Sequence, residues 1–235
     1  MKNSLFNLFW QNSKLTDHNY LNFIKWLEEY WRTENNSMSY LVYPTEDLLL
    51  KRPNDKLIKI MKKRKSDRVF SDKKITEKQL WSLFYSFSQK EDFTRLVPSW
   101  WWIYPIEVFA FLLNVKWNLN KKIVYYNSDN HSLSIVNNID NIDIQKDFWL
   151  LLEWEPSAIF VFVWFPDRVI QKYSERWGRF LLIETWHYAQ NLWLRLVQEK
   201  MKWVEAGWLK DDKIKEYLKL NGSSIVITLW FAVWF

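Results

Sequence analysis

Three consecutive tryptophans stand between two prolines in the stretch 97–105, Val-Pro-Ser-Trp-Trp-Trp-Ile-Tyr-Pro. The next segment, residues 106–113, is apolar apart from one glutamate and is expected to form a buried strand. A sharp turn into such a strand usually contains glycine, because glycine adopts left-handed backbone conformations at no steric cost and lets a ligand approach the main chain. We therefore interpret Trp100, Trp101 and Trp102 as residues that stand where glycines are expected.

Composition gives an independent reason for this interpretation. The chain has 3 glycines and 18 tryptophans, whereas an average glycine content of about 7% predicts roughly 16 glycines at this length. A single cause, a UGA codon read as tryptophan in a lineage that reads it as glycine, would correct both totals. The alternative is a truly tryptophan-rich protein with an aromatic binding surface. We favour miscoding because many tryptophans fall at predicted turns and helix ends.

The length of 235 residues allows one sizeable core, as a single domain or as a domain with an appendage. The hydrophobic fraction of 49% and the charged fraction of 26% are ordinary for a globular protein. The absence of cysteine excludes disulfides, thiolate metal ligands and a cysteine nucleophile, and it favours a reducing cytoplasm. No signal peptide is expected at the N-terminus. The longest apolar runs, at 158–165 and 225–235, are shorter than the ~18 residues of a membrane span, so we expect no membrane partner.

The formal net charge of +6 raises the question of nucleic-acid binding. The basic stretch 62–65, Lys-Lys-Arg-Lys, is the best candidate for such a contact. No helix-turn-helix, zinc-finger or RNA-recognition pattern accompanies it, and a run of this kind is more often a solvated surface or a phosphate site. We therefore expect no nucleic-acid partner.

Apolar periodicity predicts helices and strands that are interleaved without regular strand–helix–strand repeats, which favours an α+β fold. Helices are predicted within 1–32 and at 56–65, 148–152, 179–197 and 211–218, together with one that runs to about 86 from a capping box of Thr76 and Gln79. Strands are predicted at 106–113, 123–127, 133–136, 158–165 and 225–235, with 38–50 extended and 202–208 a loop. We divide the chain into an N-terminal helical and extended appendage, 1–55, and a main domain, 56–235.

Six segments carry a family resemblance. They are Phe-Trp-Gln-Asn-Ser-Lys at 9–14, Arg-Lys-Ser-Asp-Arg-Val-Phe at 64–70, the tryptophan stretch at 98–105, Val-Tyr-Tyr-Asn with His-Ser-Leu at 124–127 and 131–133, Lys-Tyr-Ser-Glu-Arg-Trp-Gly-Arg at 172–179, and Glu-Thr-Trp-His-Tyr-Ala-Gln-Asn-Leu at 184–192. In this order they resemble motifs of the nitroreductase superfamily of flavin enzymes, and most closely its SagB-type dehydrogenases, which include azoline oxidases of peptide natural products. The family pattern has glycine at Trp101, Trp102, Trp177 and Trp186, which is a second argument for miscoding.

The resemblance implies a nitroreductase-like fold, with a mixed or antiparallel central sheet flanked by helices, and a homodimer with FMN at the subunit interface. It assigns the FMN phosphate and ribityl chain to Arg64, Lys65, Ser66 and Arg68. It assigns the flavin ring to the main chain of two segments, Pro98, Ser99, Trp100, Trp101 and Trp102 in the first and Gly207 and Trp208 in the second. With tryptophan truly present at 100–102, 177 and 186, we expect no FMN binding and poor folding, because overpacking of this size exceeds what a core absorbs.

The pair Lys172-Tyr173 resembles the Lys-Tyr pair assigned to proton abstraction in azoline oxidases. Either side chain needs a lowered pKa to act as a base near neutral pH, which burial beside a flavin would give the lysine. The simpler alternative is a solvated lysine beside a packed tyrosine. Glu184 and His187 lie three residues apart on one helix face, and without further ligands we expect a structural or interface role for them, not a metal site.

The leading hypothesis is an FMN-dependent oxidoreductase of the SagB type that oxidises azoline heterocycles in peptides. A near alternative is an NAD(P)H-dependent nitro or quinone reductase on the same fold, acting on a small molecule. From a different class, an aromatic-rich protein without enzymatic activity would bind peptide, sugar or single-stranded nucleic acid on exposed indoles.

Overall fold

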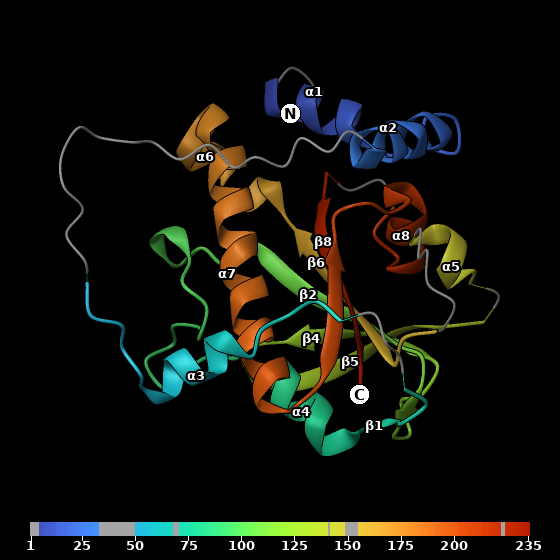
Figure 1. The fold of residues 1–235 in the computed structure, drawn as a ribbon. Helices are drawn as coiled ribbons and strands as arrows, with labels where there is room; N and C mark the ends of the chain where they lie inside the picture. Colours follow the sequence, from blue (N-terminus) through green and yellow to red (C-terminus); the bar gives the residue numbers. More distant parts are fainter. Residues whose placement is uncertain (1–4, 33–49, 68–70, 141, 149–154, 222–223) are drawn as a thin grey trace.

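The computed structural model describes residues 5–32, 50–67, 71–140, 142–148, 155–221 and 224–235. Its centre is a six-stranded sheet in the order β5-β4-β2-β6-β8-β7, in which every neighbouring pair is antiparallel (Figure 1). A short parallel pair, β1 and β3, lies outside this sheet. Helices pack against both faces of the main sheet, so the predicted α+β fold is confirmed.

The strands agree closely with the sequence pattern. They are β1 (Ile75–Thr76), β2 (Ile106–Leu112), β3 (Val115–Lys116), β4 (Lys122–Asn127), β5 (Ser132–Asn138), β6 (Ala158–Trp164), β7 (Lys202–Ala206) and β8 (Val226–Trp234). The predicted hairpin corresponds to β4 and β5, which pair directly. The two most apolar predicted strands, β6 and β8, are neighbours inside the sheet, so β8 is covered by the chain itself.

The helices form the outer layers. They are α1 (Leu5–Ser13), α2 (Tyr20–Arg32), α3 (Lys56–Lys62), α4 (Glu77–Tyr85), α5 (Ile144–Asp147), α6 (Ile170–Tyr173), α7 (Trp177–Gln198) and α8 (Asp211–Tyr217), with 3-10 turns η1 (Trp100–Trp102), η2 (Pro166–Arg168) and η3 (Ser174–Arg176). The predicted capping box begins α4: Thr76 Oγ1 accepts from the Gln79 amide and the Gln79 side chain accepts from the Thr76 amide.

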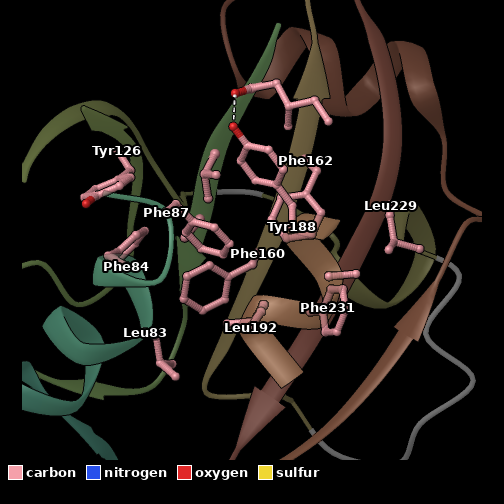
Figure 2. Close-up of a cluster of buried hydrophobic side chains, with 14 of the residues drawn as sticks. Leu83, Phe84, Phe87, Tyr126, Phe160, Phe162, Tyr188, Leu192, Leu229 and Phe231 are labelled. Atoms are coloured by element: carbon pink, nitrogen blue, oxygen red, sulfur yellow. Dashed lines mark hydrogen bonds between the residues drawn. The ribbon is translucent and has the colours of Figure 1, made fainter. Parts of the chain in front are cut away.

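Aromatic side chains fill the layer between the sheet and the two helices α4 and α7 (Figure 2). Phe84 of α4 lies 5.0 Å from Phe160 of β6, and Tyr188 of α7 stacks at 5.6 Å on Phe87, measured between ring centroids. Each fully buried ring of this kind contributes about 2–3 kcal/mol through removal from water. Because α5 and α8 cover the opposite face, β2 and β6 are buried along their whole length.

Two predicted elements differ from the structure. The predicted loop at 202–208 is wrong, because residues 202–206 form β7, an edge strand whose polar residues, Lys202 and Glu205, obscure its pattern. The basic helix predicted at 56–65 ends at Lys62. Of the helix predicted at 148–152, only Phe148 is described, and it follows α5, which ends at Asp147 and is capped by Asp143. Residues 149–152 and the extended segment predicted at 38–49 lie outside the described residues.

The N-terminal helix α1 packs on the main domain at the start of α7, and α2 packs beside the segment between β7 and α8 (Figure 1). Phe6 packs 4.4 Å from Trp177 and fills the space beside Gly178, where a Cβ atom would collide with the Phe6 ring. Two ion pairs support this packing: Lys14–Asp212 at 2.9 Å and Lys210–Asp17 at 2.7 Å. The division of the chain at residue 55 stays a prediction. No helix within the described residues is both long and apolar enough to cross a membrane.

Candidate functional site

The triple-tryptophan stretch forms the turn η1, and its backbone has the geometry that glycine favours. Trp101 has φ 55° and Trp102 has φ 57°, and Tyr104 follows with φ 48°. The left-handed region costs a residue with a Cβ atom about 1–2 kcal/mol, whereas glycine enters it freely. Two of the three tryptophans thus stand in conformations that agree with the interpretation made from the sequence. We call residues 98–105 the tryptophan loop.

Ser99 closes the tryptophan loop at its base. Its hydroxyl accepts a hydrogen bond from the Tyr104 amide at 2.9 Å and donates one to Glu184 Oε2 on α7, also at 2.9 Å. One small side chain therefore joins the two ends of the turn and ties both to the long helix.

The exit of the tryptophan loop is held by charged side chains. Arg168 donates to the Tyr104 carbonyl at 3.0 Å and pairs with the buried Glu107 at 2.5 Å. Tyr125 donates to the same carboxylate at 3.2 Å, and burial together with the charge of Glu107 raises the pKa of Tyr125 to about 12. The Arg95 amide donates to the Tyr104 hydroxyl at 2.9 Å. These contacts fix Tyr104 at the exit of the loop.

A cavity of about 490 Å³ opens beside the loop. It is lined by Pro98, Ser99, Trp100, Trp101, Trp102 and His187. Trp101 and Trp102 are 64% and 68% exposed, so their indoles are not packed into the core. In volume the cavity falls within the ~300–1,000 Å³ range of small-molecule and cofactor sites.

The predicted catalytic pair lies beside this loop. Lys172 Nζ is 4.3 Å from the centre of the Trp101 ring, within cation–π range. Tyr173 packs on Phe180 at 4.7 Å, and Trp100 packs on Phe180 at the same distance. Two segments that are about 70 residues apart in sequence therefore meet through one phenylalanine.

The environment of the pair differs from the one that base catalysis requires. The Tyr173 hydroxyl is buried and has no hydrogen-bond partner in the described part of the chain. Burial raises the pKa of Tyr173, and the nearby charge of Glu184 raises it further. Lys172 is exposed in the single chain. A second layer of protein or ligand is needed before Lys172 sits in the buried setting that the sequence suggested.

The predicted phosphate residues lie near the other end of α7. The Arg64 guanidinium is 5.6 Å from the Trp193 ring, and the exposed Lys65 pairs with Asp67 at 3.3 Å. The Asp67 amide donates to the Trp203 carbonyl of β7 at 3.2 Å, which docks this segment on the sheet edge. Ser66 is exposed, and Arg68 lies outside the described residues.

Gly207 and Trp208 occupy a third place, between β7 and α8. They line a separate cavity of about 230 Å³ together with residues of α1 and of the segment that follows it. The Trp208 carbonyl accepts a hydrogen bond from Trp230 Nε1 at 2.7 Å. A Cβ atom at Gly207 would meet nothing closer than the Thr228 carbonyl at 3.9 Å, so packing within the chain does not demand glycine there.

The two remaining tryptophans at family glycine positions differ from each other. Trp186 is 54% exposed on α7, whereas Trp177 is buried and stacks 4.5 Å from Trp164. Nowhere in the described ranges do three or more His, Asp or Glu side chains gather as a metal site would require.

Residues 61–233 match the nitroreductase family, which is well over half of the chain. The chain belongs to the nitroreductase family. The family named from the six sequence motifs is thereby confirmed, together with its fold, and the protein is a nitroreductase-family oxidoreductase.

Solved structures agree with this fold. A Ralstonia eutropha protein described as a nitroreductase is 20% identical with a TM-score of 0.66, and the match covers 81% of this chain and 86% of that one. A chain of the E. coli microcin synthetase McbBCD complex, which has truncated pro-MccB17 bound, is 17% identical with a TM-score of 0.68, and the match covers 100% and 99%. A Clostridium acetobutylicum protein described as an NADH oxidase is 17% identical with a TM-score of 0.50, covering 74% and 86%. No curated protein matches the sequence.

Sequence reasoning missed the groups that hold the tryptophan loop in this nitroreductase-family protein. Glu184 was assigned a general structural role, and neither Arg95 nor Arg168 was singled out. A signal existed for Glu184, because an acidic residue within an otherwise apolar helical stripe requires a partner. No local pattern joins Arg168 to Tyr104, since their contact depends on the antiparallel pairing of β2 and β6.

Proposed function

We propose that this protein is an FMN-dependent oxidoreductase of the SagB type that oxidises azoline heterocycles in a peptide substrate. The observation that supports the proposal most strongly is the left-handed main chain at Trp101 and Trp102, directly beside Lys172. A flavin ring binds against bare main chain, and a loop with this backbone provides such a surface when its side chains are hydrogens.

The fit of FMN depends on what stands at the loop positions. The backbone fits a group that lies against main-chain amides, and the cavity beside it suits part of a cofactor. The printed indoles do not fit, because Trp101 and Trp102 line the cavity that the ring would use. We therefore propose that the functional protein has glycine in this loop, which is the outcome of UGA miscoding.

FMN supplies the two-electron redox chemistry when bound. In the proposed site, Lys172 accepts the proton that leaves the substrate carbon, and Tyr173 orients the heterocycle. With glycine at position 101, the Lys172 ammonium group loses its indole neighbour and faces the loop itself. Lys172 must be in its neutral form to accept this proton.

A homodimer accounts for the separation of the proposed cofactor residues. Arg64 and Lys65, the tryptophan loop, and Gly207 with Trp208 lie in three places on one chain. In the proposed dimer, FMN lies at the interface and takes its contacts from both protomers. The exposed apolar side chains of Leu182 and Ile183 on α7 would supply part of that interface.

The peptide substrate is inferred from one similar structure. The microcin synthetase chain aligns with the whole of this chain, and its complex has a truncated peptide precursor bound. The NAD(P)H-dependent reductase remains the alternative within the family, in keeping with the similar protein described as an NADH oxidase. The exposed indoles of the loop favour the aromatic-rich binding protein as the alternative outside enzymology.

The proposal is tested with two versions of the full chain. One is the printed sequence, and the other carries Trp100→Gly, Trp101→Gly, Trp102→Gly, Trp177→Gly, Trp186→Gly and Trp208→Gly. We expect the glycine version to retain FMN through gel filtration at one FMN per protomer and to convert an azoline peptide to the azole, a loss of two mass units. The printed version should emerge colourless, and the gene should carry UGA at positions 100–102.

A third protein with alanine at the same six positions is the matched control, since it removes the indoles but keeps a Cβ atom at each left-handed residue. Weaker FMN binding by the alanine version would support a requirement for glycine. Reduction of FMN by NAD(P)H without azoline oxidation would favour the reductase. A colourless glycine version, together with UGG codons and tryptophan confirmed by mass spectrometry, would leave the aromatic-rich binding protein as the remaining hypothesis.

A further inference from the structure

We propose that Glu184 is a positioning residue, whose buried carboxyl group holds the tryptophan loop in shape through the Ser99 hydroxyl. The proposal deepens the proposed function, because this is the loop proposed to hold FMN. Its first tests need no cofactor and use the chain as printed.

Glu184 makes the side-chain hydrogen bond that joins α7 to the loop. Glu184 is 2% exposed, and its Oε2 atom accepts from Ser99 Oγ at 2.9 Å. Because the hydroxyl proton points at the carboxyl group, a lone pair of Ser99 Oγ is left to accept the Tyr104 amide at 2.9 Å. Glu184 therefore orients the hydroxyl, and the hydroxyl fixes the distance between the two ends of the turn.

The second oxygen of the carboxyl group shows that this arrangement is costly. Glu184 Oε1 is buried and has no hydrogen-bond partner among the described residues. A buried carboxyl group with half of its bonding capacity unused destabilises the fold, and an apolar residue would pack here at less cost. The hydrogen bond to the loop is the interaction that an apolar residue could not replace.

The charges around Glu184 set its ionisation. Burial raises the pKa of Glu184 to about 7, while the Ser99 hydroxyl, the Trp100 amide and the charge of Arg95 each oppose the rise. Glu184 in turn raises the pKa of Tyr173 on α6 and of Tyr188 on its own helix. The hydrogen bond from Ser99 favours the ionised form of Glu184. By linkage, ionisation of Glu184 strengthens the hydrogen bond from Ser99.

This reciprocity gives the first test. The Glu184 carboxyl is titrated by carbon-detected NMR in the printed chain and in Ser99→Ala. We expect Ser99→Ala to move the midpoint upward by about one pH unit, the equivalent of one charge-assisted hydrogen bond. A midpoint that stays in place or moves down would show that the hydroxyl does not act on the carboxyl, and would overturn the proposal.

The second test measures the loop itself through hydrogen exchange of the Tyr104 amide. We expect Glu184→Ala to speed this exchange about tenfold, and Glu184→Gln to restore most of the protection, because the amide oxygen still accepts from Ser99. If glutamine restores the protection of the Tyr104 amide, the side chain at position 184 acts by hydrogen bonding to Ser99 and not only by filling space. Equal exchange in both variants, with circular dichroism unchanged, would contradict it.

Glu199 offers a matched control at the other end of α7. It accepts from Ser82 Oγ at 2.6 Å, the same pair of side chains in a place that touches no part of the loop. Glu199→Ala should leave Tyr104 exchange as in the printed chain. Faster Tyr104 exchange in this variant would mean that any loss of a Ser–Glu bond loosens the fold, and Glu184 would have no special role.

A cofactor arm separates the two proposals. In the glycine version, Glu184→Ala should weaken FMN affinity about tenfold and Glu184→Gln less, measured by quenching of flavin fluorescence. If both variants bind FMN with the same affinity as the glycine version itself, the role of Glu184 toward the cofactor is overturned while the proposed function stands. Absence of FMN binding at any concentration would overturn the proposed function, while the exchange results on Tyr104 would still decide the role of Glu184.

Discussion

The tryptophans of the sheet and those of the tryptophan loop are the same residue in two physically different settings. Trp164, Trp230 and Trp234 are at most 2% exposed in β6 and β8, and Trp230 Nε1 donates a hydrogen bond to a carbonyl. Trp101 and Trp102 are mostly exposed and have left-handed backbones. The sheet indoles fill space inside the core, whereas the loop indoles line a cavity that a ligand could use.

The difference sharpens the miscoding hypothesis. Composition treats all tryptophans alike, since it only counts them. The two settings instead support glycine at Trp101 and Trp102, where the backbone favours it, and tryptophan at the buried positions of β8, where a glycine would leave a hole. Trp177 is a mixed case, because the family pattern has glycine there while the indole is buried against Trp164.

The largest expected effect is at the sheet. Trp230→Gly should lower the free energy of unfolding by about 4 kcal/mol or more, because it removes a buried indole, creates a cavity and places glycine inside a strand. Urea denaturation followed by circular dichroism measures the change. Trp186→Gly is the matched control, as its indole is 54% exposed on α7 and its loss should cost no more than about 1–2 kcal/mol, mostly from glycine in a helix. Equal losses of unfolding free energy in the two variants would contradict the distinction between buried and exposed tryptophans.

Much of the fold follows from the sequence because its signals are local or strongly periodic. The buried strands β2, β6 and β8 are apolar runs of strand length, and the capping box at Thr76 marks the start of α4 within one residue. The edge strand β7 was missed because pairing with β8, and not its own pattern, makes it a strand.

The candidate site was predictable only in part. The tryptophan loop and Lys172 were named separately from motifs, and their contact at Trp101 depends on how α6 packs against the turn. The bond from Ser99 to Glu184 spans 85 residues, so no spacing rule reveals it. Which of the predicted cofactor residues act together stays a prediction.

The next comparison uses pH, which changes the ionisation of Glu184 beside the loop and does not affect the indoles of the sheet. The pKa of Glu184 is raised from 4.5 to about 7 in the fold. A raised carboxyl pKa means that the folded state binds the proton more tightly. The stabilisation is therefore fully present below about pH 4.5 and is lost as the pH rises through about 7, up to about 3 kcal/mol in all.

Glu184→Gln has no proton to lose, so its stability should rise relative to the printed chain between pH 4.5 and pH 8. The difference between the two proteins isolates this group from others with raised pKa values, such as Asp211, whose pKa is raised to about 6. Urea denaturation at a series of pH values gives the curve. A difference that does not change with pH would mean that Glu184 is hydrated in the folded protein.

The smallest expected effect concerns the backbone of the loop alone. Two double variants, Trp101→Gly with Trp102→Gly and Trp101→Ala with Trp102→Ala, both remove the indoles and differ only in the Cβ atoms. We expect the glycine pair to be more stable than the alanine pair by about 2 kcal/mol, about 1 kcal/mol for each left-handed residue. Glycine also makes the unfolded chain more flexible, which lowers stability. A more stable glycine pair therefore means that relief of the left-handed backbone strain is the larger of the two effects. An alanine pair of equal or greater stability would show that the turn can relax to ordinary backbone angles. The argument for glycine in this loop would then rest on composition, the family pattern and the codons.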